Sequence, residues 1–490
     1  MDSQTQIVNN PKLKKQTNMF SKLHISTLIL LGIFAGLVTF ASQTKVIGQE
    51  DIVRTTCNDD FILYRTKLTC NIVLNNNKVY QPPRENILLG IGIAGQVLSW
   101  SNRCSLSLSS LRCGDIDTSK ISGGLYQLFF KIGNAQPVAR GNINFMYPLN
   151  NGVNVTRWFR YNTLKTAQHY SSYMTIADVN QLKSYGYDHV RLPLEVTDFY
   201  KNEATFDYLV DTVKLVVNSG MAIVVDAHSH SLNNKIENDI EERNKYKQFW
   251  IKLATKLQGI DSTKVFLQLY NEPIFINSSQ LWSNYQMELY SAVRTVAPNN
   301  PIVLTGNKMS HLYSIRDIAT PNDPNIIFDL HYYGNHGNVA FTHQGSTWSD
   351  DYYREVNGLM YPYQWNNCDE MVTKAKSTRG KDQVRKYCEQ RLNRAEIKKE
   401  LDSVLNPYIA QKKKIWIGEF GVNNCLADNN PIINTRLKSS KISFITDVNS
   451  ILREKGIPRA LWGFDDCFGI NARKNGNQFS FDSDYLRYLR

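Results

Sequence analysis

Two short motifs place a single glutamate at the end of an apolar run. The run Val-Phe-Leu-Gln-Leu-Tyr (265–270) is followed by Asn-Glu-Pro, which contains Glu272, and a proline cannot continue a central strand. The run Ile-Trp-Ile (415–417) is followed by Gly-Glu-Phe-Gly, which contains Glu419, and its glycines let backbone or ligand approach closely. Two carboxyl groups in one site can divide the work of proton donor and charged partner. The motifs therefore predict a site built on Glu272 and Glu419, if the fold brings both strand ends together.

After residue 142 the chain alternates apolar strand candidates with amphipathic helical stretches. Eight strands joined by helices predict a (β/α)8 TIM barrel, an α/β fold whose site lies at the C-terminal ends of the strands. In one helical stretch, for example, Phe206, Leu209 and Val213 share a face. The expected strands are Gly152–Thr156, Asp188–Leu194, Met221–Ala227, Lys264–Tyr270, Pro301–Thr305, Asn325–His331, Lys414–Gly418 and Arg459–Phe464; the expected helices are Thr205–Asn218, Glu241–Leu257, Ser278–Val296, Arg385–Ala410 and Ser439–Lys455.

Polar, titratable or aromatic side chains close nearly every expected strand of this barrel. A random surface would not repeat that arrangement, so these side chains are candidates for one shared site. In chain order they are Arg191, His228, Asn271, Glu272, His331, Tyr333, Glu419 and Trp462.

This ordered set resembles glycoside hydrolase family 5, the cellulase family. The residues that carry the resemblance are Arg191, His228, Asn-Glu-Pro at 271–273, His-x-Tyr at 331–333, Gly-Glu-Phe-Gly at 418–421 and Trp462, and the resemblance covers residue 151 to the C-terminus. Two further segments, Phe-Thr-His-Gln-Gly at 341–345 and Tyr-Pro-Tyr at 361–363, resemble loops of bacterial endoglucanase-like members. The resemblance implies a retaining glycosidase that cleaves internal β-1,4-glucosidic bonds of a β-glucan such as cellulose by double displacement. No cofactor and no metal are expected.

The resemblance also implies a role for each glutamate. Glu272 is expected to be the general acid/base and Glu419 the nucleophile, with carboxyl groups about 5–5.5 Å apart. Glu272 is expected to stay protonated, with a pKa raised towards about 6–7 by the Glu419 charge and by partial burial. Arg191 and Tyr333 are expected to keep Glu419 ionised, because a cation and a hydroxyl donor favour the charged form.

The remaining candidates are expected to bind substrate. Asn271 is placed to hydrogen-bond the 2-hydroxyl of the sugar at the reaction centre. His228 and His331 would position hydroxyls and carboxylates, and Trp462 would stack on a sugar face. The long excursion from about residue 333 to 410 is expected to shape a binding groove through its aromatic residues, which are Phe341, Trp348, Tyr361, Tyr363 and Trp365.

Several alternative functions stay open on the sequence. A β-mannanase, a xyloglucanase or a β-1,3-glucanase would carry the same catalytic residues, since the shape of the subsites sets the substrate. A catalytically inactive carbohydrate-binding protein is a further alternative, although both glutamates are present. His228-x-His230 also suggests the metal pair of amidohydrolase-type barrels, but it falls on the third expected strand, whereas that pair belongs on the first.

The N-terminus has the composition of a targeting segment. Residues 1–24 contain Lys12, Lys14, Lys15 and Lys22 against one acid, and residues 25–41 are mostly apolar. We therefore expect residues 1–42 to be a signal peptide or an uncleaved signal anchor that tethers the chain to a membrane through residues 25–41. Everything after it would be secreted, periplasmic or extracellular.

Residues 50–142 differ in kind from the barrel region. Short alternating runs separated by Asn, Gly, Pro and Ser predict a small β-rich, sandwich-like accessory domain, followed by the catalytic domain at 143–490. Eight cysteines in an exported chain favour disulfides. We expect the pairs Cys368–Cys388 and Cys425–Cys467, whereas the pairing among Cys57, Cys70, Cys104 and Cys113 stays open.

The composition of the chain excludes few functions, but it argues against nucleic-acid binding. The 490 residues carry a formal net charge of +12, and the basic residues are dispersed along the chain. No module that combines aromatic and basic residues for nucleic-acid binding is recognisable. The expected partner is a polysaccharide bound by a monomer.

Overall fold

A computed structural model of the chain describes the barrel region and the β-rich region. Several predictions lie outside the described residues: the segment 1–42, the pair Cys425–Cys467, and the aromatic residues Phe341 and Trp348. The described residues are 52–57, 67–74, 86–93, 96–101, 104–107, 110–117, 124–145, 149–162, 164–323, 325–334, 355–356, 358–411, 413–422, 431–466, 468–470, 472–475 and 478–480.

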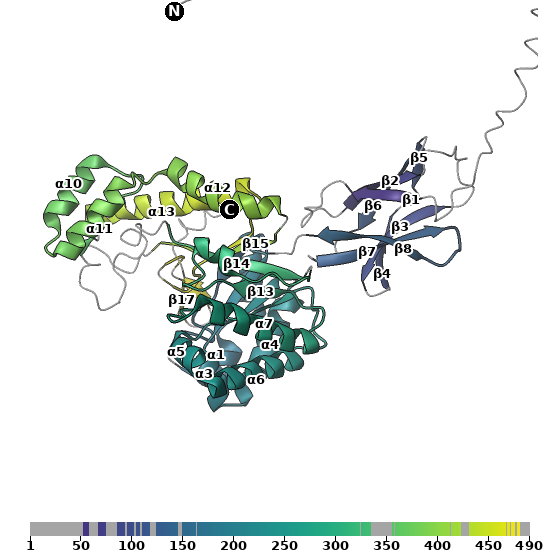
Figure 1. Ribbon diagram of the computed structural model, residues 1–490, viewed down its shortest axis with the longest axis horizontal. Helices are drawn as coiled ribbons and strands as arrows, with labels where there is room; N and C mark the ends of the chain where they lie inside the picture. The colour runs from purple at the N-terminus through teal and green to yellow at the C-terminus, as the bar shows by residue number, and fades with distance from the viewer. Residues whose placement is uncertain are drawn as a thin grey trace, which may run out of the picture.

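The predicted barrel is confirmed, because eight parallel strands close on themselves in the order β10-β11-β12-β13-β14-β15-β16-β9 (Figure 1). All eight expected strands form, with ends that differ from the prediction by a few residues. They are β9 Asn151–Asn154, β10 His189–Leu194, β11 Ala222–Ala227, β12 Val265–Gln268, β13 Ile302–Thr305, β14 Ile326–Tyr332, β15 Ile415–Phe420 and β16 Arg459–Leu461.

Alternation along each strand divides the core into two parts. In β11, Val224 points into the barrel, where it packs with Phe266 and Trp416 from other strands. Its neighbours Ile223 and Val225 belong to the larger core between the strands and the surrounding helices. Successive strand side chains point to opposite faces, so the apolar runs of the sequence supply both parts. The polar strand-end residues are then left at the C-terminal lip of the barrel.

Helices cover the outside of the barrel, and α10 to α13 gather on one side of it (Figure 1). No helix among the residues placed by the structure is long and apolar enough to cross a membrane. The helices are α1 Ala167–Ser172, α2 Ile176–Ser184, α3 Val196–Lys201, α4 Ala204–Asn218, α5 Asn233–Asn238, α6 Ile240–Lys256, α7 Ser279–Val296, α10 Trp365–Lys374, α11 Thr378–Glu389, α12 Arg394–Ala410 and α13 Pro431–Glu454, with 3₁₀ turns η2 His230–Leu232 and η3 Leu312–Asp317.

The single helix predicted over Arg385–Ala410 is wrong, because the chain breaks between α11 and α12. Arg391 adopts a positive φ of 48°, a conformation that a helix cannot contain. Asn393 then starts α12 as its N-cap, and its side chain accepts hydrogen bonds from the backbone N–H groups of Ala395 and Glu396. The Arg-Leu-Asn sequence at 391–393 therefore ends one helix and, through its asparagine cap, begins the next.

The aromatic residues of the excursion after β14 do not all face one groove. Tyr361 is buried, its hydroxyl donates to Asp447 of α13, and its ring packs edge-on against Phe444. Trp365, at the start of α10, is 61% exposed and lies near Tyr363. Tyr361 is therefore part of the core, and only Tyr363 and Trp365 remain as described candidates for a groove.

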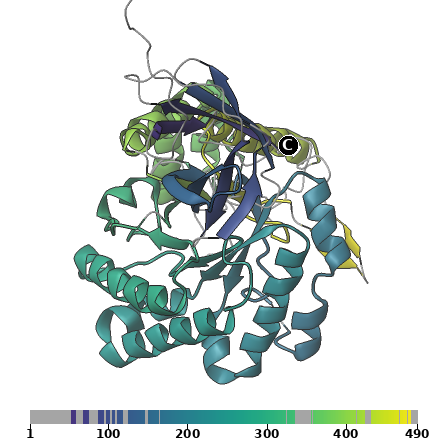
Figure 2. The same cartoon turned by 90° about the vertical axis from the view of Figure 1, so that its right-hand side faces the viewer.

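The N-terminal region forms two four-stranded antiparallel sheets, which Figure 2 shows in front of the barrel. Buried apolar side chains from both sheets, including Ile72, Leu89, Leu111 and Phe130, form one separate core, as expected for a sandwich. The last strand runs to Phe145, past the expected domain boundary at 142. The strands are β1 Ile52–Cys57, β2 Lys67–Leu74, β3 Ile87–Ile93, β4 Gln96–Trp100, β5 Ser105–Ser107, β6 Ser110–Asp117, β7 Gly124–Ile132 and β8 Val138–Phe145.

The described side chains include the disulfides Cys368–Cys388 and Cys104–Cys113. Cys368–Cys388 joins α10 to α11, as predicted. Cys104–Cys113 links β6 to the residue before β5 and resolves one of the pairings that the sequence leaves open. Covalent links of this kind form in oxidising compartments.

Removing the Cys368–Cys388 disulfide should destabilise the protein. The bond closes a loop with a sequence separation of 20 residues, and constraining such a loop in the unfolded chain is worth about 3 kcal/mol. We expect the Cys368→Ala/Cys388→Ala double variant to unfold at lower urea concentration than the wild type. A double variant with an unchanged midpoint would show that this bond adds nothing to global stability.

Candidate active site

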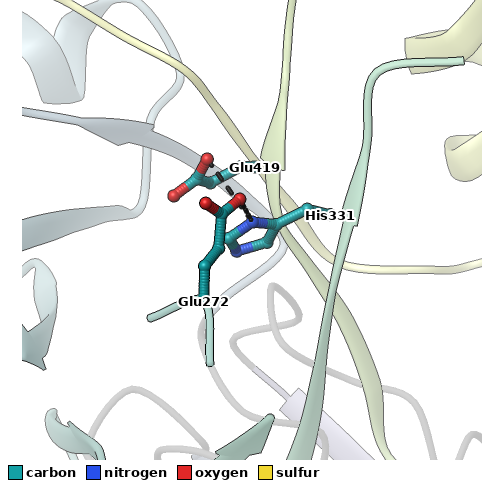
Figure 3. Close-up of side chains that lie close together, drawn as sticks. All are labelled: Glu272, His331 and Glu419. Carbon is teal, nitrogen blue, oxygen red and sulfur yellow. Dashed lines mark hydrogen bonds and ion pairs between the residues drawn. The ribbon is translucent and has the colours of Figure 1, made fainter. Parts of the chain in front are cut away.

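The closed barrel brings Glu272 and Glu419 together although they are far apart in sequence. Glu419 lies on β15, and Glu272 follows β12. Their side chains point toward one another beside the His331 ring (Figure 3). One carboxylate oxygen from each glutamate and one ring nitrogen of His331 all lie within 4.8 Å of one another. Both glutamates are largely buried, at 9% and 3% exposure, so their charges interact strongly.

Arg191 is the buried cation beneath this pair. Its Nη1 donates to Glu419 Oε1 at 2.7 Å and to Asn154 Oδ1 at 2.8 Å. Its Nη2 donates to Asn271 Oδ1 at 2.6 Å and lies 2.9 Å from Asp226 Oδ2. The guanidinium is fully buried, and its forked donors hold residues from several strands in fixed relative positions.

His331 contacts both glutamates and a third carboxylate. Its Nδ1 lies 2.7 Å from Glu272 Oε1 and 3.5 Å from Glu419 Oε2, and its Nε2 lies 3.2 Å from Asp329 Oδ2. Burial alone would lower the pKa of His331, but the Glu419 and Asp329 carboxylates and the hydrogen bonds with Asp329 and Glu272 raise it to about 10. His331 is therefore an imidazolium at neutral pH.

The predicted pKa direction for Glu272 is wrong in the substrate-free protein. Burial would raise the pKa of Glu272, but the hydrogen bond and charge of His331, together with His230 and Arg191, lower it. For Glu419 the balance is the reverse. Burial and the charge of Glu272 together raise its pKa above the ordinary value, more than His331, Arg191 and the Tyr333 hydroxyl lower it. The expectation failed because the sequence does not reveal that His331 faces Glu272 directly.

Stability should depend on pH through His331. The folded-state pKa of His331 is about 10 against an ordinary value of 6.5. The stabilisation is therefore fully present below pH 6.5 and is lost as the pH rises through about 10. Between these values the free energy of unfolding should fall more steeply in the wild type than in His331→Gln, with a difference in slope on the order of 1 kcal/mol per pH unit.

Urea unfolding at a series of pH values would measure this difference in slope. If the free energy of unfolding changed with pH in the same way in the wild type and in His331→Gln, His331 would not be charged in the folded protein.

The other predicted site residues gather around this centre. Tyr333 donates to Glu419 Oε2 at 2.8 Å. The Asn271 amide nitrogen lies 3.0 Å from His228 Nε2, and His228 Nδ1 lies 3.0 Å from Asp226 Oδ2. The Trp462 ring lies beside the His228 ring, with centroids 5.3 Å apart. All eight predicted residues thus belong to one constellation at the C-terminal lip of the barrel.

Sequence reasoning missed several residues that hold this constellation. Gln268 donates from Nε2 to Asp329 Oδ2 at 2.6 Å, and Asn154 donates to the backbone carbonyls of Gly418 and Leu461. The sequence signal that could have identified Gln268 is its position as a polar residue inside an otherwise apolar strand. His230, the second histidine of the His-x-His motif, lies 3.5 Å from Glu272 Oε2 and is partly exposed.

A local irregularity in the sheet places Glu419 opposite His331. Leu330 pairs with Ile417, but His331 pairs with Glu419, so Gly418 is an extra residue in β15. The Gly418 N–H donates to Asp329 Oδ1 at 2.8 Å. A Cβ on residue 418 would lie 2.3 Å from the same oxygen, and only glycine fits this close approach.

Glu272, His331 and Glu419 are also the donor set that could hold a metal ion among the residues placed by the structure. Two carboxylates and an imidazole are ligands that Zn²⁺ accepts. However, the shared His331 nitrogen already contacts both carboxylates, and Arg191 and Tyr333 already donate to Glu419. The donor set is thus neutralised by protein cations and donors, and we assign no metal to it.

Comparisons with known proteins agree with this geometry. The family described as cellulase, glycosyl hydrolase family 5, matches residues 149–467. Endoglucanase C of Acetivibrio thermocellus is 23% identical over 328 residues, which cover 64% of this chain and 90% of that protein. Endoglucanase 3 of Fibrobacter succinogenes is 24% identical over 356 residues, which cover 66% of this chain and 50% of that protein.

Solved structures share the fold at low sequence identity. The clostridial cellulose synthase subunit Z from Clostridioides difficile has a TM-score of 0.53 at 20% identity, covering 70% of this chain and 99% of that chain. Endoglucanase Cel5A from Thermotoga maritima has a TM-score of 0.52 at 18% identity, covering 70% of this chain and 97% of that chain. These similarities agree with the barrel assignment.

Proposed function

Because the chain belongs to glycosyl hydrolase family 5, the cellulase family, and is therefore a glycosidase, we propose that it cleaves internal β-1,4-glucosidic bonds of a β-glucan such as cellulose with retention of configuration. The observation that carries the proposal is the short separation of the two glutamates. Their nearest carboxylate oxygens lie within 4.8 Å. Retaining enzymes need carboxyl groups about 5–5.5 Å apart, whereas inverting enzymes need about 6.5–9.5 Å to admit a water molecule.

In the proposed first step, Glu419 acts as nucleophile and Glu272 as acid. A Glu419 oxygen forms a bond to the anomeric carbon while the bond to the leaving oxygen breaks, and that oxygen takes a proton from Glu272. Arg191 and Tyr333 each donate to a different oxygen of Glu419, which favours its ionised form in the substrate complex.

In the proposed second step, Glu272 acts as a base. It removes a proton from water, the water oxygen bonds to the anomeric carbon, and the bond to Glu419 breaks. The carboxylate of Glu419 and the proton on Glu272 are thereby restored.

A panel of soluble polysaccharides would test the substrate. We expect reducing ends to appear from carboxymethylcellulose and mixed-linkage β-glucan, with a rapid fall in viscosity as internal bonds break. Activity should persist after exhaustive chelation, because each step uses carboxyl groups of the chain. Cleavage of mannan, xyloglucan or β-1,3-glucan alone would overturn the substrate class and leave the mechanism standing. No cleavage of any polysaccharide would favour the inactive, carbohydrate-binding alternative.

We also propose that the chain acts outside the cytoplasm as a monomer. The basic and apolar composition of residues 1–42 and the Cys104–Cys113 and Cys368–Cys388 disulfides support export. Mass analysis of the protein recovered from its host would distinguish cleavage near residue 42 from retention as a membrane anchor. Recovery of the full-length chain in the cytosolic fraction would overturn the assignment.

A further inference from the structure

The hydrogen bonds around Asp329 determine which nitrogen of His331 faces Glu272. Asp329 Oδ1 accepts from the Gly418 N–H at 2.8 Å, and its Oδ2 accepts from Gln268 Nε2 at 2.6 Å. The orientation of the Gln268 amide is fixed, because its Oε1 accepts from Arg191 Nε at 2.8 Å. Asp329 is fully buried, and N–H donors occupy both of its oxygens. It therefore acts as a carboxylate acceptor toward His331 Nε2, 3.2 Å away.

From this arrangement we propose that Asp329 is a positioning residue of the acid step: it keeps the Nε2–H of His331 in place, so that Nδ1 is the nitrogen that exchanges a proton with Glu272. The proposal rests on the proposed function of Glu272 as the acid. Neither Asp329 nor Gln268 is among the residues that contact a sugar in that function.

Each proton in the acid step can be followed through this hydrogen-bond network. In the free protein the shared proton lies on His331 Nδ1, 2.7 Å from Glu272 Oε1. Its transfer to Glu272 leaves a neutral imidazole with its remaining proton on Nε2, bonded to Asp329, and a neutral carboxyl group. Glu272 then gives the proton to the leaving oxygen as the glycosidic bond breaks. After water returns a proton to Glu272, the same proton can pass back to Nδ1.

Charged and titratable groups face His331 from several elements, and Asp329 is the one that contacts Nε2. Because a carboxylate beside Nε2 favours the imidazolium, its removal should lower the pH at which His331 loses its charge. The basic limb of the kcat/KM profile should then move to lower pH. The groups that interact with His331 are Asp226 and His228 from the end of β11, His230 from η2, Glu272 after β12 and Glu419 from β15. Arg191 and Tyr333 act on it through Glu419, to which both donate.

Leaving-group dependence gives the decisive experiment. The phenyl group of phenyl β-cellobioside leaves only when its oxygen is protonated. The dinitrophenolate of 2,4-dinitrophenyl β-cellobioside is a good leaving group and departs without an acid. For Asp329→Asn we expect kcat/KM to fall about 100-fold on the phenyl substrate, within the range for loss of general acid catalysis, and to change little on the dinitrophenyl substrate. The ratio of the two values is independent of the folded fraction, so partial misfolding does not obscure it.

Asp226→Asn is the matched control. Asp226 is equally buried and also contacts Arg191, but it is bonded to His228 and not to His331. This variant should lose activity by the same factor on both substrates. If Asp329→Asn accumulates too little protein, Asp329→Ser avoids placing an amide donor against Gln268 and should give the same pattern.

The outcomes separate the two proposals. Equal losses on both substrates for Asp329→Asn, or an unmoved basic limb, would overturn the role of Asp329 in the acid step while leaving the glycosidase intact. A wild type that hydrolyses neither cellobioside nor any polysaccharide would overturn the proposed function itself.

Discussion

Replacing Glu419 by glutamine should lower kcat on a soluble β-glucan by at least about 10⁴-fold, because a neutral amide cannot form the bond to the anomeric carbon. The variant should keep its fold, since glutamine has nearly the same shape. Its amide oxygen can still accept from Arg191, and its amide N–H can donate to the Tyr333 hydroxyl, which is able to accept as well as donate. Reducing-end release at saturating substrate measures the loss, and circular dichroism checks the fold. Residual activity within ten-fold of the wild type would remove Glu419 from the role of nucleophile.

Azide can separate the roles of the two glutamates. With an activated aryl cellobioside, Glu419→Ala leaves room for azide to attack the anomeric carbon directly, which inverts it and gives the α-glycosyl azide. In Glu272→Ala the Glu419 ester forms first and azide displaces it, which gives the β-glycosyl azide. NMR of the products distinguishes the two anomers. The opposite assignment of products would exchange the roles of Glu272 and Glu419.

The second large effect is expected on stability. Arg191→Met should destabilise the protein by about 3–5 kcal/mol, because it removes the buried cation that contacts Asp226 and one oxygen of Glu419. Urea unfolding would measure the loss. Arg385→Met removes an exposed arginine that pairs with Asp382 on α11 and should have no measurable effect. A wild-type unfolding midpoint for Arg191→Met would mean that Arg191 contributes only to catalysis.

The barrel could be predicted because each of its strands is a buried apolar run closed by a polar residue. Parallel strands in a closed barrel bring all their C-terminal ends to one lip, so Arg191, Glu272 and Glu419 had to meet once the strands were correctly identified. The break before α12 could not be predicted from periodicity. It depends on the backbone conformation of Arg391 and on the cap made by Asn393, and both fall within a stretch with helical composition.

The members of the site were readable from the sequence, but their charge states were not. A pKa depends on which groups lie within a few ångströms, and the sequence does not show that His331 Nδ1 lies 2.7 Å from Glu272 Oε1. Gln268 was hidden for a related reason. Its role comes from two partners on different strands, Arg191 and Asp329, and no sequence spacing connects them.

The extra residue at position 418 limits how this chemistry could be moved to another protein. Glu419 faces His331 only because β15 slips by one position against β14, and Asp329 fills the space that a side chain at 418 would need. If the glutamate alone were placed on a barrel strand with regular pairing, its side chain would not face the histidine of the neighbouring strand. The smallest part that could be transferred is therefore the pair β14 and β15 with its register shift, including Gly418, which has no proposed contact with the sugar.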